Sequence, residues 1–167
     1  MSDRFFNILL ITSISLISLW GFAAFTGCFG GRDDAPAQVQ IGSAIWDVDL
    51  AMNDEQRYRG LAGRAYIDES VGMLFMYPDS RPRAYCMRGC LIPIDIAFID
   101  SELRIVKIYT MAVEPDRAGR VSYPSIVPAQ YAFEVAGGAL ARNGVVEGAK
   151  VTFLGNIPDP TKAAPGP

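Results

Sequence analysis

The chain has 167 residues, enough for one modest domain with a targeting segment and tails, and its formal net charge is −3. A mildly acidic chain has no electrostatic footprint for nucleic acid, so we expect no nucleic-acid partner. The sequence contains no histidine, which excludes Ser-His-Asp and Cys-His catalytic pairs and histidine metal sites.

The N-terminus has the features of an export signal. A short polar start containing Arg4 is followed by an uncharged apolar run over residues 8–25, long enough for a bilayer span or for the core of a signal peptide. The sequence Phe-Thr-Gly-Cys at residues 25–28 resembles the bacterial lipoprotein box, whose cysteine receives lipid. We therefore expect residues 1–27 to be a signal peptide and Cys28 to be lipidated. An uncleaved membrane anchor and ordinary cleavage are the alternatives.

Lipid on Cys28 would anchor the protein to a membrane and place its domain in an extracytoplasmic compartment, the cell envelope or periplasm. Disulfides persist in such compartments. Residues 28–38 mix Gly, Asp and Pro and predict a flexible tether, and the Pro-rich residues 157–167 predict a disordered tail. The domain itself is expected over residues 39–156.

Within the domain, apolar residues recur with a period of two, which predicts strands. We expect strands over residues 39–52, 72–77, 84–90, 94–100, 103–111, 131–137 and 149–155. Asn53, followed by acidic residues and then arginines, predicts the N-cap of a short helix that ends near Gly60 or Gly63. Residues 138–144 predict a second helical turn. The fold class is therefore mainly β, an antiparallel sheet forming a small sandwich or partial barrel with one or two short helices.

Four motifs occur in a specific order along the domain. They are Arg-Gly-Leu at 59–61, Gly-Met-Leu-Phe at 72–75, Leu-Ile-Pro-Ile-Asp-Ile-Ala-Phe-Ile-Asp at 91–100 and Tyr-Ala-Phe-Glu-Val-Ala-Gly-Gly at 131–138. In this order they resemble a family of small, often exported bacterial and archaeal proteins, the domain of unknown function 192. The resemblance covers about residues 44–155. It implies a mainly β single domain and no established activity.

The chain departs from the family pattern at Cys86, Gly89 and Cys90, where the family usually has tryptophan, asparagine and threonine. Two cysteines in an oxidising compartment first suggest a disulfide. Four residues of extended strand span about 13 Å, too far for a bridge, so a disulfide would need a turn or bulge at Gly89. Two unpaired thiols or a redox pair are the alternatives. A metal site is disfavoured, because two thiolates make a poor tetrahedral set.

Asp95 is a lone carboxylate in an apolar strand, on the face opposite Ile96. A buried and unpaired carboxylate is costly, so we expect Arg59 or Arg88 to pair with it. Such a pair would be structural, or Asp95, Arg59 and Arg88 would line a binding pocket beside the long loop at residues 112–130.

The leading hypothesis is a lipid-anchored, extracytoplasmic binding or accessory domain without a cofactor. Its partners would be the membrane, through Cys28, and an unidentified small molecule or protein. One alternative is a hydrolase of envelope saccharides with Asp95 and Glu134 as acid and base, if their separation allows it. Another is thiol-redox chemistry at Cys86 and Cys90. The lack of a complete catalytic set favours a binding domain over an enzyme.

Replacing Cys28 with serine tests the lipoprotein hypothesis. Because the hydroxyl cannot receive the thioether-linked lipid, the Cys28→Ser protein should leave the membrane fraction or remain unprocessed. Fractionation and gel mobility measure this. Unchanged mobility together with unchanged membrane retention would contradict lipidation.

Overall fold

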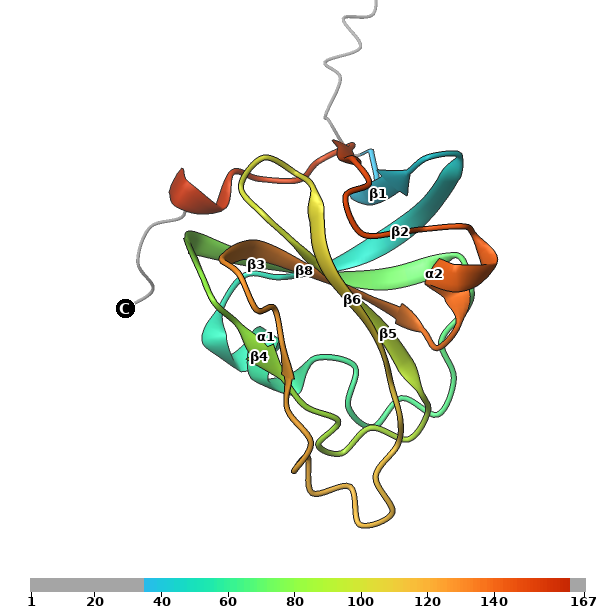
Figure 1. Ribbon diagram of the computed structural model, residues 1–167. Helices are drawn as coiled ribbons and strands as arrows, with labels where there is room; N and C mark the ends of the chain where they lie inside the picture. Colours follow the sequence, from blue (N-terminus) through green and yellow to red (C-terminus); the bar gives the residue numbers. More distant parts are fainter. Residues whose placement is uncertain (1–34, 163–167) are drawn as a thin grey trace, which may run out of the picture. The chain divides into compact units, whose positions relative to one another are not determined.

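The computed structural model describes residues 35–162, whose strands form a curled seven-stranded sheet and a two-stranded ribbon (Figure 1). The order in the sheet is β6-β5-β8-β3-β2-β1-β9. Its strands are β1 (Gln38–Ile41), β2 (Ala44–Ala51), β3 (Val71–Arg81), β5 (Ile94–Ile99), β6 (Ile105–Met111), β8 (Ala129–Ala136) and β9 (Val151–Leu154). The ribbon pairs β4 (Ala84–Tyr85) with β7 (Tyr123–Pro124). The predicted mainly β fold, a partial barrel with short helices, is confirmed.

The expected signal peptide and Cys28 lie outside the described residues. Within residues 35–162, no helix is both long enough and apolar enough to cross a membrane.

One pair of neighbouring strands, β2 and β3, runs parallel, whereas the other pairs of the sheet are antiparallel as expected. Parallel neighbours cannot be joined by a tight hairpin, so their connection must cross a face of the sheet. Here the connection contains α1 (Asp54–Arg59) and residues 60–70. This crossover places α1 beside the β4 ribbon in Figure 1.

Helix α1 begins at the predicted N-cap. The Asn53 side chain accepts a hydrogen bond from the Gln56 N–H at 2.8 Å, and the Gln56 side chain accepts one from the Asn53 N–H at 3.2 Å. This reciprocal capping box satisfies two N–H groups that the first turn leaves free. The helix ends at Gly60, whose N–H donates to the Gln56 carbonyl at 2.9 Å.

Both faces of the central strands are buried. Alternating residues of β3 divide between two hydrophobic clusters: Leu74 and Met76 join the cluster inside the curled sheet, and Met73 and Phe75 join the cluster on its outer face. This explains why residues 72–77 are continuously apolar rather than alternating. The inner cluster takes residues from all seven strands of the sheet, and α2 (Ala139–Arg142) adds Ala139 and Leu140 to it.

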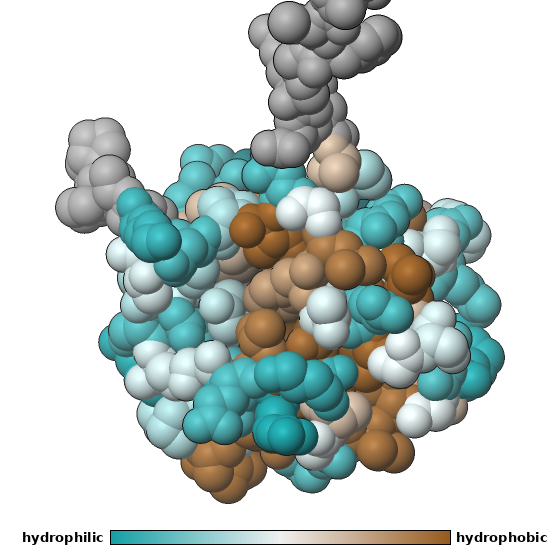
Figure 2. Space-filling view, turned by 90° about the horizontal axis from the view of Figure 1, so that it is seen from above, coloured by the Kyte–Doolittle hydropathy of each residue, from teal (hydrophilic) through white to brown (hydrophobic). Residues whose placement is uncertain are grey.

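The two edges of the sheet approach each other at one end. Ile105 donates to the Ala149 carbonyl at 3.0 Å, and Val151 donates to the Leu103 carbonyl at 2.8 Å. These bonds tie β9 to the start of β6 and curl the sheet into a partial barrel. In the view of Figure 2, hydrophobic side chains gather at the middle of the face and reach its lower edge, with hydrophilic side chains around much of the rest.

Three local expectations need correction. The expected strand over residues 39–52 is a hairpin that turns at Gly42, whose φ is 60°. The expected strand over 84–90 ends at Tyr85, and the chain then turns. Ordered structure continues past residue 156, since Pro160–Lys162 form a 3-10 turn (η1) in which Pro160 is buried.

Removing the N-cap tests how strongly α1 depends on its capping box. Asn53→Ala leaves the Gln56 N–H without its acceptor and should lower the free energy of unfolding by about 1 kcal/mol. Chemical denaturation measures this, with Asn156→Ala as the matched control because Asn156 is exposed and its side chain makes no hydrogen bond within residues 35–162. Equal losses in both variants would contradict the role of the cap.

Candidate functional site

A cavity of about 150 Å³ lies on the outer face of the sheet, where the end of α1 meets the chain after β4. Its wall is formed by residues 57–62, by Phe75 and Tyr77 of β3, by Cys86, Arg88 and Cys90 with the two residues of β4, and by Glu134 of β8. The lining combines aromatic side chains with a few polar groups that converge on one space. Small-molecule sites in proteins have this composition.

Glu134 lies at the floor of the pocket. It is 4% exposed, and it pairs through the backbone with Met73 and Ile96 in the middle of the sheet. Gly60 passes above it, so that a Cβ at Gly60 would lie 3.4 Å from the Phe75 ring and 3.8 Å from Glu134 Oε2. The backbone of Gly60 has φ 49° and ψ −137°, a conformation available to glycine at little cost.

The Glu134 side chain makes no hydrogen bond or ion pair with residues 35–162. Its oxygens keep contact with the pocket, whereas Asp95 Oδ1 is fully enclosed without a partner. Burial raises its pKa to about 8, because removal from water penalises the charged form. The group is therefore mostly protonated at pH 7. A buried carboxyl without a partner is unfavourable for folding, and such groups concentrate at functional sites.

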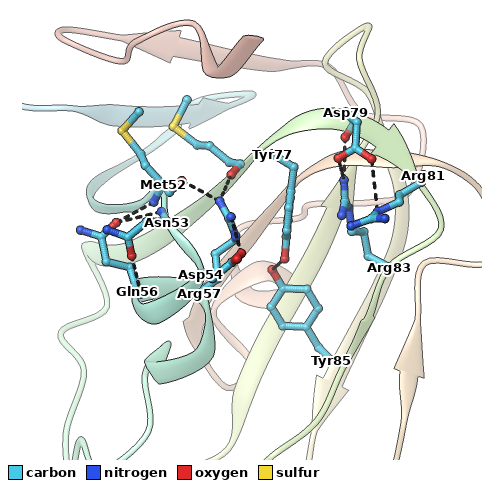
Figure 3. A network of polar contacts seen from close by, with 11 residues as sticks. Met52, Asn53, Asp54, Gln56, Arg57, Tyr77, Asp79, Arg81, Arg83 and Tyr85 are labelled. Carbon is cyan, nitrogen blue, oxygen red and sulfur yellow. Dashed lines mark hydrogen bonds and ion pairs between the residues drawn. The ribbon is translucent and has the colours of Figure 1, made fainter. Parts of the chain in front are cut away.

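A network of aromatic and charged side chains makes one wall rigid (Figure 3). The Tyr77 and Tyr85 hydroxyl groups lie 2.7 Å apart and share a hydrogen bond. The Arg57 and Arg83 guanidinium groups lie on either side of Tyr77, 4.8 and 3.6 Å from the ring centroid. Cation–π attraction of this kind is worth about 0.5–2 kcal/mol per pair, depending on burial.

Arg57 also fixes α1 to the sheet. Its Nη1 donates to the Met52 carbonyl at 2.7 Å and to the Met76 carbonyl at 2.8 Å, and its Nη2 pairs with Asp54 at 2.7 Å. These bonds join the helix to the residue after β2 and to the middle of β3. Arg57 is thus part of the pocket's frame and has few donors left for a ligand.

The mouth of the pocket carries Arg59 and Arg88, two of the residues proposed from sequence. Arg59 forms an exposed ion pair with Glu55 at 2.8 Å, which contributes little to stability and is easily exchanged for another anion. The Arg88 guanidinium lies 4.1 Å from the centre of the Tyr58 ring and has no carboxylate partner in the described part of the chain. The structure brings these two arginines together.

Asp95 is not part of this pocket, and the expected pair with Arg59 or Arg88 is not formed. It is 1% exposed, and its Oδ2 accepts a hydrogen bond from the Leu140 N–H at 3.0 Å, while Oδ1 has no partner. Asp95 faces the inner cluster with α2, whereas Glu134 faces the outer pocket. The sheet separates the two carboxyl groups, so they cannot act together as an acid–base pair on one substrate.

Cys86 and Cys90 are not bridged, which corrects the expected disulfide. Both thiols line the pocket. Burial, followed by the nearby Glu134, raises the pKa of Cys90 to about 11, so this thiol stays protonated at neutral pH. A protonated thiol is a poor nucleophile, which disfavours redox chemistry here. Among residues 35–162 there is no group of three or more ligating side chains that could hold a metal ion.

The long segment at 112–130 supports the pocket from behind without lining it. The Gly89 N–H donates to the Arg117 carbonyl at 3.0 Å. Gly119 packs so closely that a Cβ there would lie 2.7 Å from the Arg88 Cβ and 2.9 Å from the Cys86 sulfur. The segment therefore holds the turn that presents Cys86 and Arg88.

Sequence reasoning named Glu134 only as half of a catalytic pair and did not name Tyr77 or Tyr85. A single charge in an apolar strand was the signal for Glu134. The two tyrosines gave no signal, since aromatic residues in strands usually belong to the core.

The model of the DUF192 family, described as "Uncharacterized ACR", matches residues 37–153. Two solved structures are similar at 28% identity and a TM-score of 0.63. One, a protein of Sinorhizobium meliloti 1021 described as a candidate transcription regulator, matches over 71% of this chain and 92% of its own. The other, a protein of unknown function from Novosphingobium aromaticivorans DSM 12444, matches over 70% and 83%. No curated protein matches the chain.

The pKa of Glu134 predicts how stability depends on pH. Between pH 5 and 8 the folded protein keeps a proton that Glu134 of the unfolded chain has lost, so stability falls as pH rises. The slope should reach up to about 1.4 kcal/mol per pH unit. No histidine titrates in this range, because the chain has none.

Glu134→Gln keeps the shape of the side chain and removes its titration. Urea denaturation from pH 5 to 8 should give a flatter profile for this variant than for the wild type. Parallel profiles would show that Glu134 does not hold a proton in the folded state.

Proposed function

Since this chain belongs to the DUF192 family, whose members are described as uncharacterised, we propose a function from its own pocket: the domain binds a small organic ligand. The observation that carries this proposal is the unpartnered, buried carboxyl group of Glu134 at the floor of a cavity lined by aromatic rings. A ligand that hydrogen-bonds to Glu134 would offset the cost of burying this group.

Catalysis receives less support. Asp95, on the neighbouring strand β5, faces the opposite side of the sheet, and the Cys90 thiol stays protonated. The pocket lining therefore has a single carboxyl group, and its Cys90 thiol is not activated. A binding or accessory role fits these groups better than hydrolysis or thiol exchange.

The proposed location of this binding domain is the cell envelope. The apolar run at residues 8–25 and the lipoprotein-like box ending at Cys28 support export and a lipid anchor. The tether at residues 28–38 would then allow the domain to meet its ligand outside the cytoplasm. The Sinorhizobium meliloti protein is described as a candidate transcription regulator, which suggests DNA binding as an alternative function. The net charge of −3 does not favour this alternative.

Filling the pocket tests the proposal. The full chain is heated with each member of a panel of small molecules: glucose, acetate, propionate, ethylamine, glycine and L-alanine. At least one should raise the Tm, since a ligand at 100 times its Kd stabilises the folded state by about 2.7 kcal/mol. Ala62→Trp places an indole in the lining and should abolish that rise.

Ala141→Trp is the matched control, because Ala141 is exposed on α2, outside the pocket lining. It should retain the ligand-induced rise. If Ala62→Trp alone unfolds the protein, Ala84→Trp at the exposed edge of the pocket replaces it. A panel without any effect on the wild type, or an equal rise in all variants, would contradict binding in this pocket.

A further inference from the structure

The pocket holds an acidic group and a basic group at two different depths. Glu134 lies at the floor and is 4% exposed, while Arg88 lies at the mouth and is exposed. Cys90 lies in the same lining. Burial and then Glu134 raise the pKa of its thiol, and Arg88 lowers it. Within residues 35–162, neither charged group has an ion-pair partner.

The floor suits a cationic group. Glu134 is the acidic residue of the lining, and its neighbours Phe75 and Tyr85 are aromatic, with ring centroids 5.1 Å apart and nearly perpendicular planes. An ammonium group binds a desolvated carboxylate strongly and is attracted to aromatic faces. No arginine pairs with Glu134, so the position beside its carboxyl group is free for a ligand.

The mouth suits an anionic group. Arg88 is held over the Tyr58 ring and keeps its N–H donors free of protein carboxylates in the described part of the chain. Arg59 is beside it in the lining, and its exposed pair with Glu55 is easily exchanged. A guanidinium group binds a carboxylate through two parallel hydrogen bonds. The same positive charge disfavours ligands that carry only a cation.

The volume limits the size of the ligand. The cavity, at about 150 Å³, is smaller than the pockets of about 300–1,000 Å³ that hold drug-sized ligands, so it suits a small ligand. A ligand of this size brings its charged groups within a few bonds of each other. A molecule with one charge would match one end of the pocket and leave the other end desolvated and unpaired.

We infer that the ligand is a small zwitterion, of the size of a simple α-amino acid. Glu134 binds its ammonium group at the floor, and Arg88 binds its carboxylate at the mouth. This inference rests on the proposed function of the pocket as a ligand site and adds the chemical class of the ligand.

Binding of the ammonium group requires Glu134 to be charged. Other groups that face the pocket are the hydroxyls of Tyr77 and Tyr85, the thiols of Cys86 and Cys90, and the guanidinium groups of Arg57, Arg59 and Arg88. Burial raises the pKa values of both tyrosines and of Cys90, so these three groups stay protonated below pH 8. Binding at pH 7 should therefore release about one proton, and affinity should rise about tenfold from pH 6 to pH 7.

Calorimetric titration of the full chain with three related probes tests the inference. L-alanine carries both charges, propionate lacks the ammonium group, and ethylamine lacks the carboxylate. L-alanine should bind about 100-fold or more tightly than either, because each analogue leaves one buried or oriented group unpaired. Titrations in buffers of different ionisation enthalpy measure the released proton.

Two variants separate the ends of the pocket. Glu134→Gln should weaken L-alanine binding about 100-fold, abolish the proton release and leave propionate binding unchanged. Arg88→Gln, at an exposed position, should weaken L-alanine and propionate alike and leave proton release in place. Arg81→Gln is the matched control, since Arg81 is exposed and outside the lining, and it should change neither. Thermal unfolding confirms that each variant is folded.

The outcomes distinguish this inference from the proposed function. Suppose that propionate or glucose binds as tightly as L-alanine and that Ala62→Trp abolishes this binding. The inference of a zwitterionic ligand would then be wrong, and the pocket would remain a ligand site. L-alanine binding that survives Ala62→Trp would place the ligand elsewhere and overturn both. If Glu134→Gln does not fold, the Arg88→Gln titration and the wild-type proton release decide the inference.

Discussion

The parallel pairing of β2 and β3 is the constraint on which the pocket depends. Two adjacent parallel strands require a connection that crosses the sheet, and in this protein the connection lies over the outer face. It brings α1 and Gly60 above Phe75 and Glu134. A hairpin between antiparallel strands would have left Glu134 on an open surface, where water would satisfy its carboxyl group.

The crossover is fixed by few but well-placed contacts. Arg57 donates to the carbonyl groups of Met52, after β2, and of Met76, in the middle of β3, and its guanidinium group lies over Tyr77. Tyr77 in turn is hydrogen-bonded to Tyr85. On the other side of Tyr77, the buried Arg83 donates to the Asp79 and Ala129 carbonyls. The aromatic wall is thus clamped between two guanidinium groups. A preformed wall lowers the ordering cost of binding.

Two carboxyl groups on neighbouring strands have different surroundings. Asp95 accepts the N–H of Leu140 and helps to hold α2 against the inner cluster. Glu134 receives no such bond and is next to a cavity. Strand alternation separates them, because Asp95 pairs across the ladder with Val135, the residue after Glu134, and successive side chains point to opposite faces. Burial is common to both, but only Glu134 can meet a ligand.

The sequence by itself determined the mainly β class, the capped helix at Asn53 and the family, because strand alternation, capping and motif order are local properties of the chain. It also predicted that a carboxyl group in an apolar strand is costly to bury and therefore has either a partner or a functional role. It did not identify which carboxyl group is the functional candidate, nor that Cys86 and Cys90 follow a turn and remain unbridged. The first outcome depends on which face of the sheet the β2–β3 crossover covers, and the second on the 112–130 segment that packs against the turn. Only the tertiary structure decides this, since residues far apart in sequence, such as Gly60 and Glu134, become neighbours through it.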